Sequence, residues 1–307
     1  MKFLGSIELP EHKAAGGFDH AAVHAAAGRL YVAHTGNDAI DVIDCEQDRY
    51  LSSVRGMKGV AGALVSEELG LVFTSNRGED TVGILQANDP QNVRKVAVGV
   101  RPNGLAVDPE TELLLAANVG NPDIPGSTTL SMVDVRRSKL IHSIPVPGRT
   151  RWTIFDRQSG CFFVNIAEPY QIVVVKAAEP DLVARTISVP GRGPHGLDLD
   201  PATGRLFCAC DEGKLFALDA ASGAVLLRAE LSGTPDVIFF NAAFKHLYVA
   251  IGDPGVVDVF DTDRLERVET IPTAKGAHTL GFDPTRNKIY VFEPGSHRAA
   301  VYQDEPT

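Results

Sequence analysis

The feature that most constrains this chain is a repeated segment with a period of about 41 to 48 residues. Each repeat begins with a lead residue, continues as an alternating strand, passes through a turn and ends in an apolar strand. The clearest repeats begin at Asn103, His195 and His278. The seven lead residues, in register, are Asp19, Ala61, Asn103, Arg151, His195, Asp236 and His278.

A repeat of this length that contains four short strands predicts one blade of a β-propeller. Segments such as Leu30–Ala33, Ala39–Ile43 and Leu247–Ile251 are rich in the β-branched and aromatic residues that strands favour. No window of helical length shows a sustained 3.6-residue period. We therefore expect an all-β, seven-bladed β-propeller with four antiparallel strands in each blade, forming a single domain over residues 1–307.

The two ends of the chain indicate how the ring closes. The residues that follow His278 suffice for three strands, and Phe3–Leu9 at the other end can supply the fourth. An open array of blades would leave two unpaired sheet edges, which invite aggregation. We therefore expect the N-terminal strand to complete the last blade.

The charge balance excludes some partners. The chain carries 39 acidic and 29 basic side chains, for a net charge of −10, so we expect no binding to the phosphate backbone of nucleic acids.

No stretch approaches the roughly 18 apolar residues of a membrane span, so we expect no membrane partner. Glu8 and Pro10 interrupt the N-terminal apolar run too early for a signal peptide. We expect a soluble monomer that is cytoplasmic, or periplasmic or secreted if a signal peptide has been removed.

Two segments carry a family resemblance. Leu30–Asp44, which reads LYVAHTGNDAIDVID, and Val98–Pro109, which reads VGVRPNGLAVDP, resemble the repeat of the YVTN (YncE-like) β-propeller proteins. Tyr-Val-Ala here replaces Tyr-Val-Thr. The resemblance extends over nearly the whole chain and implies a seven-bladed fold, but it implies no single activity.

Propeller topology separates functional candidates from turn residues. The loops that lead into strand a and the b–c loops share one face of the disc, and the other turns lie on the opposite face. Asp108, Asp200 and Asp283 each precede a proline in an a–b turn, where Asp accepts backbone hydrogen bonds. The lengthened b–c loop 120–129 could form a wall on the ligand face. The candidate ligand-binding residues on that face are Asp19, His20, His34, Asn103, Trp152, Asp211 and Asp253.

A divalent metal site is one chemistry that this face could support. His195, Asp236, His278 and Glu293 come from neighbouring blades, and their imidazole and carboxylate groups suit Mg²⁺, Mn²⁺ or Zn²⁺. The placement of His278 and Glu293 is similar to the layout in streptogramin lyases. That similarity implies Mg²⁺-assisted elimination across a lactone.

Acid–base catalysis without a metal is the second chemistry. The candidate catalytic residues are His195, His278, Arg151 and Glu168, which could transfer protons and stabilise an oxyanion. The segment Gly193–His195 resembles part of the seven-bladed lactonases, which use His, Glu and Arg, although Pro194 stands where they have Arg.

The third hypothesis involves no reaction. Six of the seven lead residues are polar or charged, which favours a small polar ligand in the central funnel. The leading expectation is such ligand binding, with lyase or lactone-hydrolase chemistry as its enzymatic form. The alternative is a non-catalytic scaffold for a protein or peptide partner. A quinone-cofactor dehydrogenase is a more remote hypothesis, and no cofactor-attachment motif such as C-x-x-C-H is present.

Overall fold

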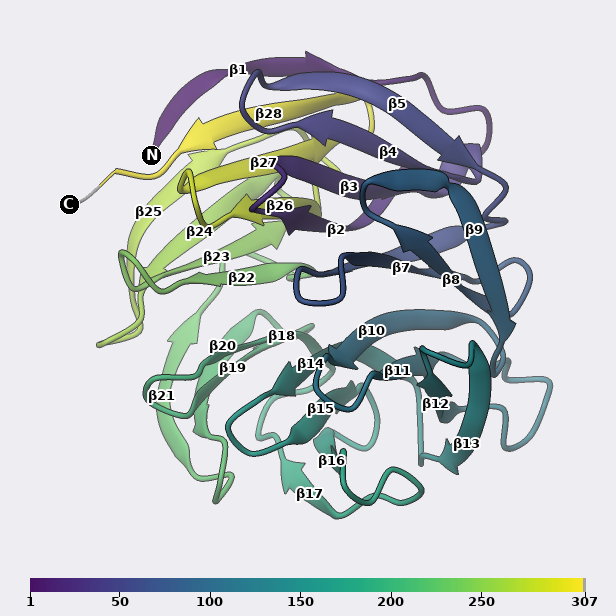
Figure 1. Cartoon of the computed structure of the whole chain (residues 1–307). Coiled ribbons are helices and arrows are strands. Elements are labelled where there is room, and N and C mark those ends of the chain that lie inside the picture. Colours follow the sequence, from purple (N-terminus) through teal and green to yellow (C-terminus); the bar gives the residue numbers. More distant parts are fainter. Residues whose placement is uncertain (306–307) are drawn as a thin grey trace.

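The computed structural model describes residues 1–305, and these form seven four-stranded antiparallel sheets arranged around a central axis (Figure 1). The seven-bladed prediction is therefore confirmed. The single-domain boundary at residue 307 falls on the last two residues, which lie outside the described part of the chain. Within residues 1–305, no helix has the length and apolar character needed to cross a membrane.

Each blade runs from an inner strand a to an outer strand d. Blade 1 contains β2 (Phe18–His24), β3 (Arg29–His34), β4 (Ala39–Asp44) and β5 (Arg49–Arg55), with the short 3₁₀ turn η1 (Thr35–Asn37) between β3 and β4. Blade 2 contains β6 (Val60–Ser66), β7 (Leu71–Asn76), β8 (Thr81–Gln86) and β9 (Asp89–Ala97). Blade 3 contains β10 (Pro102–Asp108), β11 (Leu113–Asn118), β12 (Thr129–Asp134) and β13 (Lys139–Pro145).

The remaining blades follow the same order. Blade 4 contains β14 (Thr150–Asp156), β15 (Cys161–Ile166), β16 (Gln171–Lys176) and β17 (Arg185–Ser188). Blade 5 contains β18 (Pro194–Asp200), β19 (Arg205–Cys210), β20 (Lys214–Asp219) and β21 (Val225–Glu230). Blade 6 contains β22 (Ile238–Asn241), β23 (His246–Ile251), β24 (Val256–Asp261) and β25 (Glu266–Pro272). Blade 7 contains β26 (Thr279–Asp283), β27 (Lys288–Glu293), β28 (Arg298–Gln303) and β1 (Lys2–Glu8).

The burial of each strand follows from its place in a blade. Strands b and c, such as β3 and β4, are buried on both faces because each blade packs between two neighbours. Strand d, such as β13, alternates between exposed and less exposed positions because it lies at the rim. The two predicted strands Leu30–Ala33 and Ala39–Ile43 are confirmed within β3 and β4.

The apolar core is divided among the blade interfaces. Residues 1–305 contain seven apolar clusters, and each cluster joins two adjacent blades. One of them packs Leu115 and Met132 of blade 3 against Phe162 and Val173 of blade 4. Burial of a large apolar side chain stabilises a fold by about 1.5 to 3 kcal/mol. The ring therefore holds together through seven similar interfaces.

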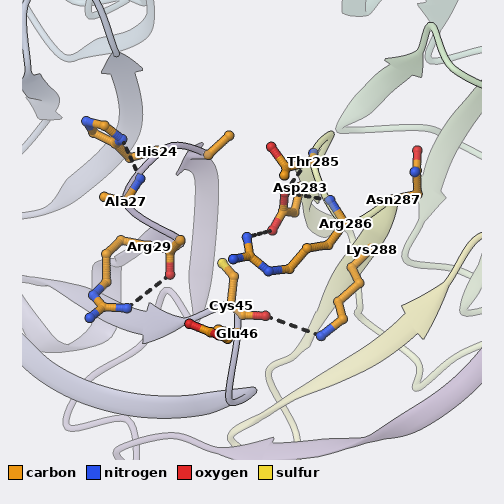
Figure 2. Close-up of polar contacts among 12 residues, drawn as sticks. His24, Ala27, Arg29, Cys45, Glu46, Asp283, Thr285, Arg286, Asn287 and Lys288 are labelled. Atoms are coloured by element: carbon orange, nitrogen blue, oxygen red, sulfur yellow. Dashed lines mark hydrogen bonds and ion pairs between the residues drawn. The ribbon is translucent and has the colours of Figure 1, made fainter.

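The N-terminal strand closes the ring as predicted. β1 pairs antiparallel with β28, with Lys2 opposite Gln303 and Glu8 opposite Arg298. The two strands lie side by side at the top of Figure 1. The interface between blades 1 and 7 also has polar contacts, shown in Figure 2, where Nζ of Lys288 donates to the carbonyl oxygen of Cys45 at 3.2 Å.

The aspartates of the a–b turns have the predicted structural role. Asp108 accepts hydrogen bonds from the Glu110 backbone N–H at 3.0 Å and from the Thr111 hydroxyl at 2.6 Å. Asp283 accepts hydrogen bonds from the Thr285 backbone N–H and from the guanidinium of Arg286. These carboxylates stabilise tight turns, so they do not contribute to the ligand face.

Candidate functional site

The lead residues of the blades gather at one end of the central axis because their inner strands approach closely. A Cβ on Gly104 would lie 2.6 Å from the backbone oxygen of Arg151, the lead residue of the next blade. A Cβ on Gly196 would lie 2.5 Å from the backbone oxygen of Asp236 in the same way. Glycine after the lead residue therefore allows neighbouring lead residues to pack together. We call the polar region that they form the upper bowl.

His195 is at the centre of a polar network in the upper bowl. Its Nδ1 lies 2.7 Å from Oδ1 of Asp211, and its Nε2 lies 3.2 Å from Oδ1 of Asp236. The guanidinium of Arg151 donates to Oδ2 of Asp211 at 3.1 Å and lies 3.1 Å from Nε2 of His195. Asp211 comes from a b–c loop and Asp236 from the next blade, so the network confirms that these loops share one face.

The network holds His195 in its charged form. Burial by itself lowers the pKa of His195, but the charge of Asp236 and hydrogen bonds to Asp211 and Asp236 outweigh burial and raise it to about 9. Burial acts to raise the pKa of Asp236, but the charge of His195 and its hydrogen bond to Asp236 outweigh burial and lower the pKa far below its usual value. At neutral pH His195 is therefore a cation between two carboxylates. It can donate protons, but it is not a free base.

His278 has a different environment on the other side of Asp236. Its Nδ1 donates to the backbone oxygen of Gly276 at 2.7 Å, which fixes the orientation of the ring. Its Nε2 lies 3.9 Å from Oδ2 of Asp236, too far for a hydrogen bond. The side chain is 39% exposed, compared with 15% for His195. His278 therefore presents an accessible ring nitrogen to a ligand.

An aromatic contact crosses the axis beneath these groups. His20 of blade 1 and Trp152 of blade 4 have ring centroids 4.1 Å apart, and Trp152 also packs edge-on against Phe239. The pKa of His20 is lowered, chiefly by burial, so the ring favours its neutral form. Trp152 and His20 therefore form the floor of the upper bowl.

Asp19 and Asn103 are linked through an arginine on the same face. Asp19 lies 3.4 Å from the guanidinium of Arg77, which also donates to Oδ1 of Asn103. The structure therefore brings together nine of the predicted residues around the bowl: Asp19, His20, Asn103, Arg151, Trp152, His195, Asp211, Asp236 and His278.

A cavity begins on the other side of His20 and Trp152. It has a volume of about 560 Å³ and extends along the inner strands to Glu67 and Glu68 in an a–b turn. Its walls are mainly apolar, with Asp198 among its polar residues. Burial raises the pKa of Asp198 to about 6, in opposition to the backbone N–H donors of Phe240 and Leu199. This lower channel is chemically distinct from the upper bowl.

Four predicted site residues lie away from the centre of the bowl. His34 is fully buried, where its Nδ1 pairs with Asp41 at 2.6 Å and its Nε2 lies 2.6 Å from Nδ1 of His12. Asp253 is largely exposed and lies 3.5 Å from Nζ of Lys275.

The other two are glutamates. Glu293 accepts a hydrogen bond from the Ser296 hydroxyl at 2.9 Å. Glu168 is exposed and lines a side cavity of about 490 Å³ together with Arg149 and Arg151. Within residues 1–305, none of the polar contacts joins either glutamate to His195 or His278.

The metal prediction receives no support from the arrangement of donors. In the described part of the chain, no group of three or more His, Cys, Asp and Glu side chains could hold a metal ion. Both ring nitrogens of His195 already bond to carboxylates, so a metal would have to displace the His195 proton.

Sequence reasoning missed a group of arginines beside the bowl. Arg101 and Arg149 line a cavity of about 350 Å³ together with the loop 119–128. Arg149 and Arg192 also line the neighbouring side cavity with Tyr170. The available signal was positional, because Arg101 and Arg149 each stand two residues before a lead residue, where most other blades have glycine.

Comparison with known proteins places the fold in a family. Residues 57–297 match the family model described as YNCE-like beta-propeller. The chain belongs to the YncE-like β-propeller family. A search of curated proteins found no match. This membership agrees with the repeat resemblance seen in the sequence, but it does not specify a ligand.

Solved structures share the fold of this YncE-like propeller at low sequence identity. A chain of hydrazine synthase from Kuenenia stuttgartiensis superposes with a TM-score of 0.84 at 13% identity, covering 97% of each chain. A chain of a mitotic checkpoint complex superposes with a TM-score of 0.82 at 11% identity, covering 99% of this chain and 92% of the other. At such identities the likeness shows the propeller architecture alone.

Proposed function

We propose that this YncE-like propeller binds a small polar ligand in the upper bowl. The proposal rests on the different environments of the two histidines on either side of Asp236. On one side His195 is fully hydrogen-bonded and charged, and on the other side Nε2 of His278 is accessible and lies beyond hydrogen-bond distance of Asp236. A ligand that offers a donor to His278 and an acceptor to Arg151 fits this arrangement.

The enzymatic form of the proposal is acid–base chemistry on a lactone or related cyclic ester. His278 is better suited than His195 to accept a proton, because its Nε2 is accessible while His195 is already protonated. His195 and Arg151 together would stabilise a developing oxyanion. Hydrolysis and elimination would both use these roles, and the ring-opened product distinguishes them.

Trp152 supplies a direct test because it is the only tryptophan in the chain. Its ring packs against His20 at the floor of the bowl, so ligand binding should change its fluorescence. We would titrate a panel of γ- and δ-lactones and the corresponding hydroxy acids. We expect a saturable change in emission that His278→Ala weakens by about tenfold or more.

The matched control is His142→Ala, on the outer strand β13, which should leave the fluorescence titration unchanged. A wild-type protein that responds to no member of the panel would contradict the proposal, as would an equal response in His278→Ala. If binding is present, product analysis by NMR decides the chemistry. An intact ligand indicates recognition alone, a hydroxy acid indicates hydrolysis and an unsaturated acid indicates elimination.

A further inference from the structure

Arg101 and Arg149 occupy the same position in two adjacent blades. Arg101 stands two residues before the lead residue Asn103 in blade 3, and Arg149 stands two residues before Arg151 in blade 4. Four other blades have glycine at this position with positive φ, namely Gly17, Gly59, Gly193 and Gly276. Blade 6 has Thr234. Arginine therefore replaces glycine where the two blades meet.

The backbone of Arg101 shows that this replacement carries a cost. Arg101 has φ of 55°, within the left-handed region that glycine adopts freely and other residues avoid. Its backbone N–H donates to Oδ1 of Asp80 at 2.8 Å, and its carbonyl accepts from the Val119 N–H at 2.9 Å. Glycine would make both backbone bonds with less strain. What the arginine adds is a guanidinium beside the cavity.

The cavity between the two arginines is already formed. It has a volume of about 350 Å³, and the loop 119–128 makes the rest of its wall. Within that loop the Ser127 hydroxyl accepts from the Asn121 N–H at 2.8 Å, and the Ile124 N–H donates to the Asn121 oxygen at 2.9 Å. The loop is anchored because the Gly120 N–H donates to the backbone oxygen of Val100 at 3.0 Å. A ligand would therefore meet an ordered wall.

The two guanidinium groups lack the counter-ions that their neighbours have. Arg77 pairs with Asp19, Arg151 with Asp211 and Arg192 with Glu212. Among residues 1–305, neither Arg101 nor Arg149 forms an ion pair, although the whole chain carries a net charge of −10. The pKa of Arg149 is lowered by partial desolvation and then by the charges of Arg151, Arg77 and Arg101. The charge of Asp211 acts in the opposite direction, but it pairs with Arg151 rather than with Arg149.

We propose that Arg101 and Arg149 form a two-guanidinium clamp that binds the carboxylate or phosphate group of a small molecule against the loop 119–128. Planar guanidinium groups bind both anions through paired, charge-assisted hydrogen bonds. Both side chains are exposed, so the anion reaches them from solvent. The clamp lies beside the upper bowl and does not rest on the function proposed for the bowl.

The test is isothermal titration calorimetry of the full chain at low ionic strength, with inorganic phosphate and malonate as separate probes. We expect saturable binding of at least one probe. Arg101→Gly and Arg149→Thr install residues that other blades carry at this position, so both variants should fold. Each should weaken binding by about tenfold or more, because each removes charge-assisted hydrogen bonds.

Controls separate this site from general charge effects and from the bowl. Arg157 pairs with Glu68 on an a–b turn of the opposite face, and Arg157→Gly removes the same charge without touching the clamp. It should bind both probes as the wild type does, and so should His278→Ala. The absence of saturable binding to both probes would overturn the clamp, as would equal weakening by Arg157→Gly. The Trp152 titration of Arg101→Gly reports on the bowl separately.

Discussion

His195 and Asp211 form a close ion pair, in which Nδ1 of His195 lies 2.7 Å from Oδ1 of Asp211. The ring's other nitrogen lies 3.2 Å from Oδ1 of Asp236, so one imidazole bridges two carboxylates from adjacent blades. Such a bridge stabilises the folded protein only while the imidazole is charged. The protonation of His195 is therefore linked to the stability of the ring.

The first prediction concerns stability at alkaline pH. The folded-state pKa of His195 is about 9, above the value of about 6.5 expected in the unfolded chain. Its contribution is therefore complete below about pH 6.5 and is lost as pH rises through 9. We expect the free energy of unfolding to fall by up to about 3 kcal/mol over that range. Urea denaturation at a series of pH values measures this change.

His195→Gln should reduce this loss of stability at alkaline pH, whereas His142→Gln on β13 should leave it unchanged. If His195→Gln loses as much stability as the wild type over this range, another group causes the loss. The acid side has the opposite sign. The pKa of Asp236 is lowered, so its contribution is present above the usual pKa of about 4 and is lost as pH falls below it.

The second prediction concerns the cause of the raised pKa. Asp236 acts on His195 through both its charge and a hydrogen bond. Asp236→Asn should therefore lower the pKa of His195 by about one unit or more. NMR titration of the imidazole Cε1–H signal measures the pKa directly. Asp253→Asn, at an exposed carboxylate, provides the matched control. An unshifted titration in Asp236→Asn would show that Asp211 alone holds the proton.

The third prediction concerns the floor of the bowl. Trp152 packs against His20 across the axis and against Phe239, so its removal would join the bowl to the lower channel. Because Trp152 is only partly buried, we expect Trp152→Ala to reduce the free energy of unfolding by about 2 to 4 kcal/mol. Trp152→Phe should lose less than about 1.5 kcal/mol. Equal losses in the two variants would show that ring packing is not the cause.

The sequence predicts the fold well because the same blade is encoded seven times. Where the pattern of one strand is unclear, the equivalent strands of the other six blades show where it lies. β1 could be assigned because the last blade lacked a partner for β28. The lead residues were found for the same reason, since their register follows from the period. His195, Asp236 and His278 do meet around the axis, although each is more than 40 residues from the next along the chain.

Features that occur only once are not encoded by the repeat. His34 is the last residue of β3, a strand that the sequence predicted, but its partner His12 lies in the segment between β1 and β2, which no other blade contains. Sequence periodicity therefore could not show that His34 is buried. The protonation of His195 was also missed, because it depends on distances to two carboxylates rather than on residue type.

The last prediction concerns the C-terminal end of the ring. Asp304 is buried, and its carboxylate accepts hydrogen bonds from Nδ1 of His246 at 2.8 Å and from the Tyr248 hydroxyl at 2.5 Å. Asp304→Ala would leave both donors buried without their acceptor. We expect a loss of about 2 to 4 kcal/mol in urea denaturation, while Asp304→Asn should lose less because its amide oxygen still accepts. Asp263→Ala, at an exposed pair with Lys245, should change stability by less than about 1 kcal/mol. If Asp304→Ala proves as stable as Asp263→Ala, the contacts that join blade 6 to the chain end do not stabilise ring closure.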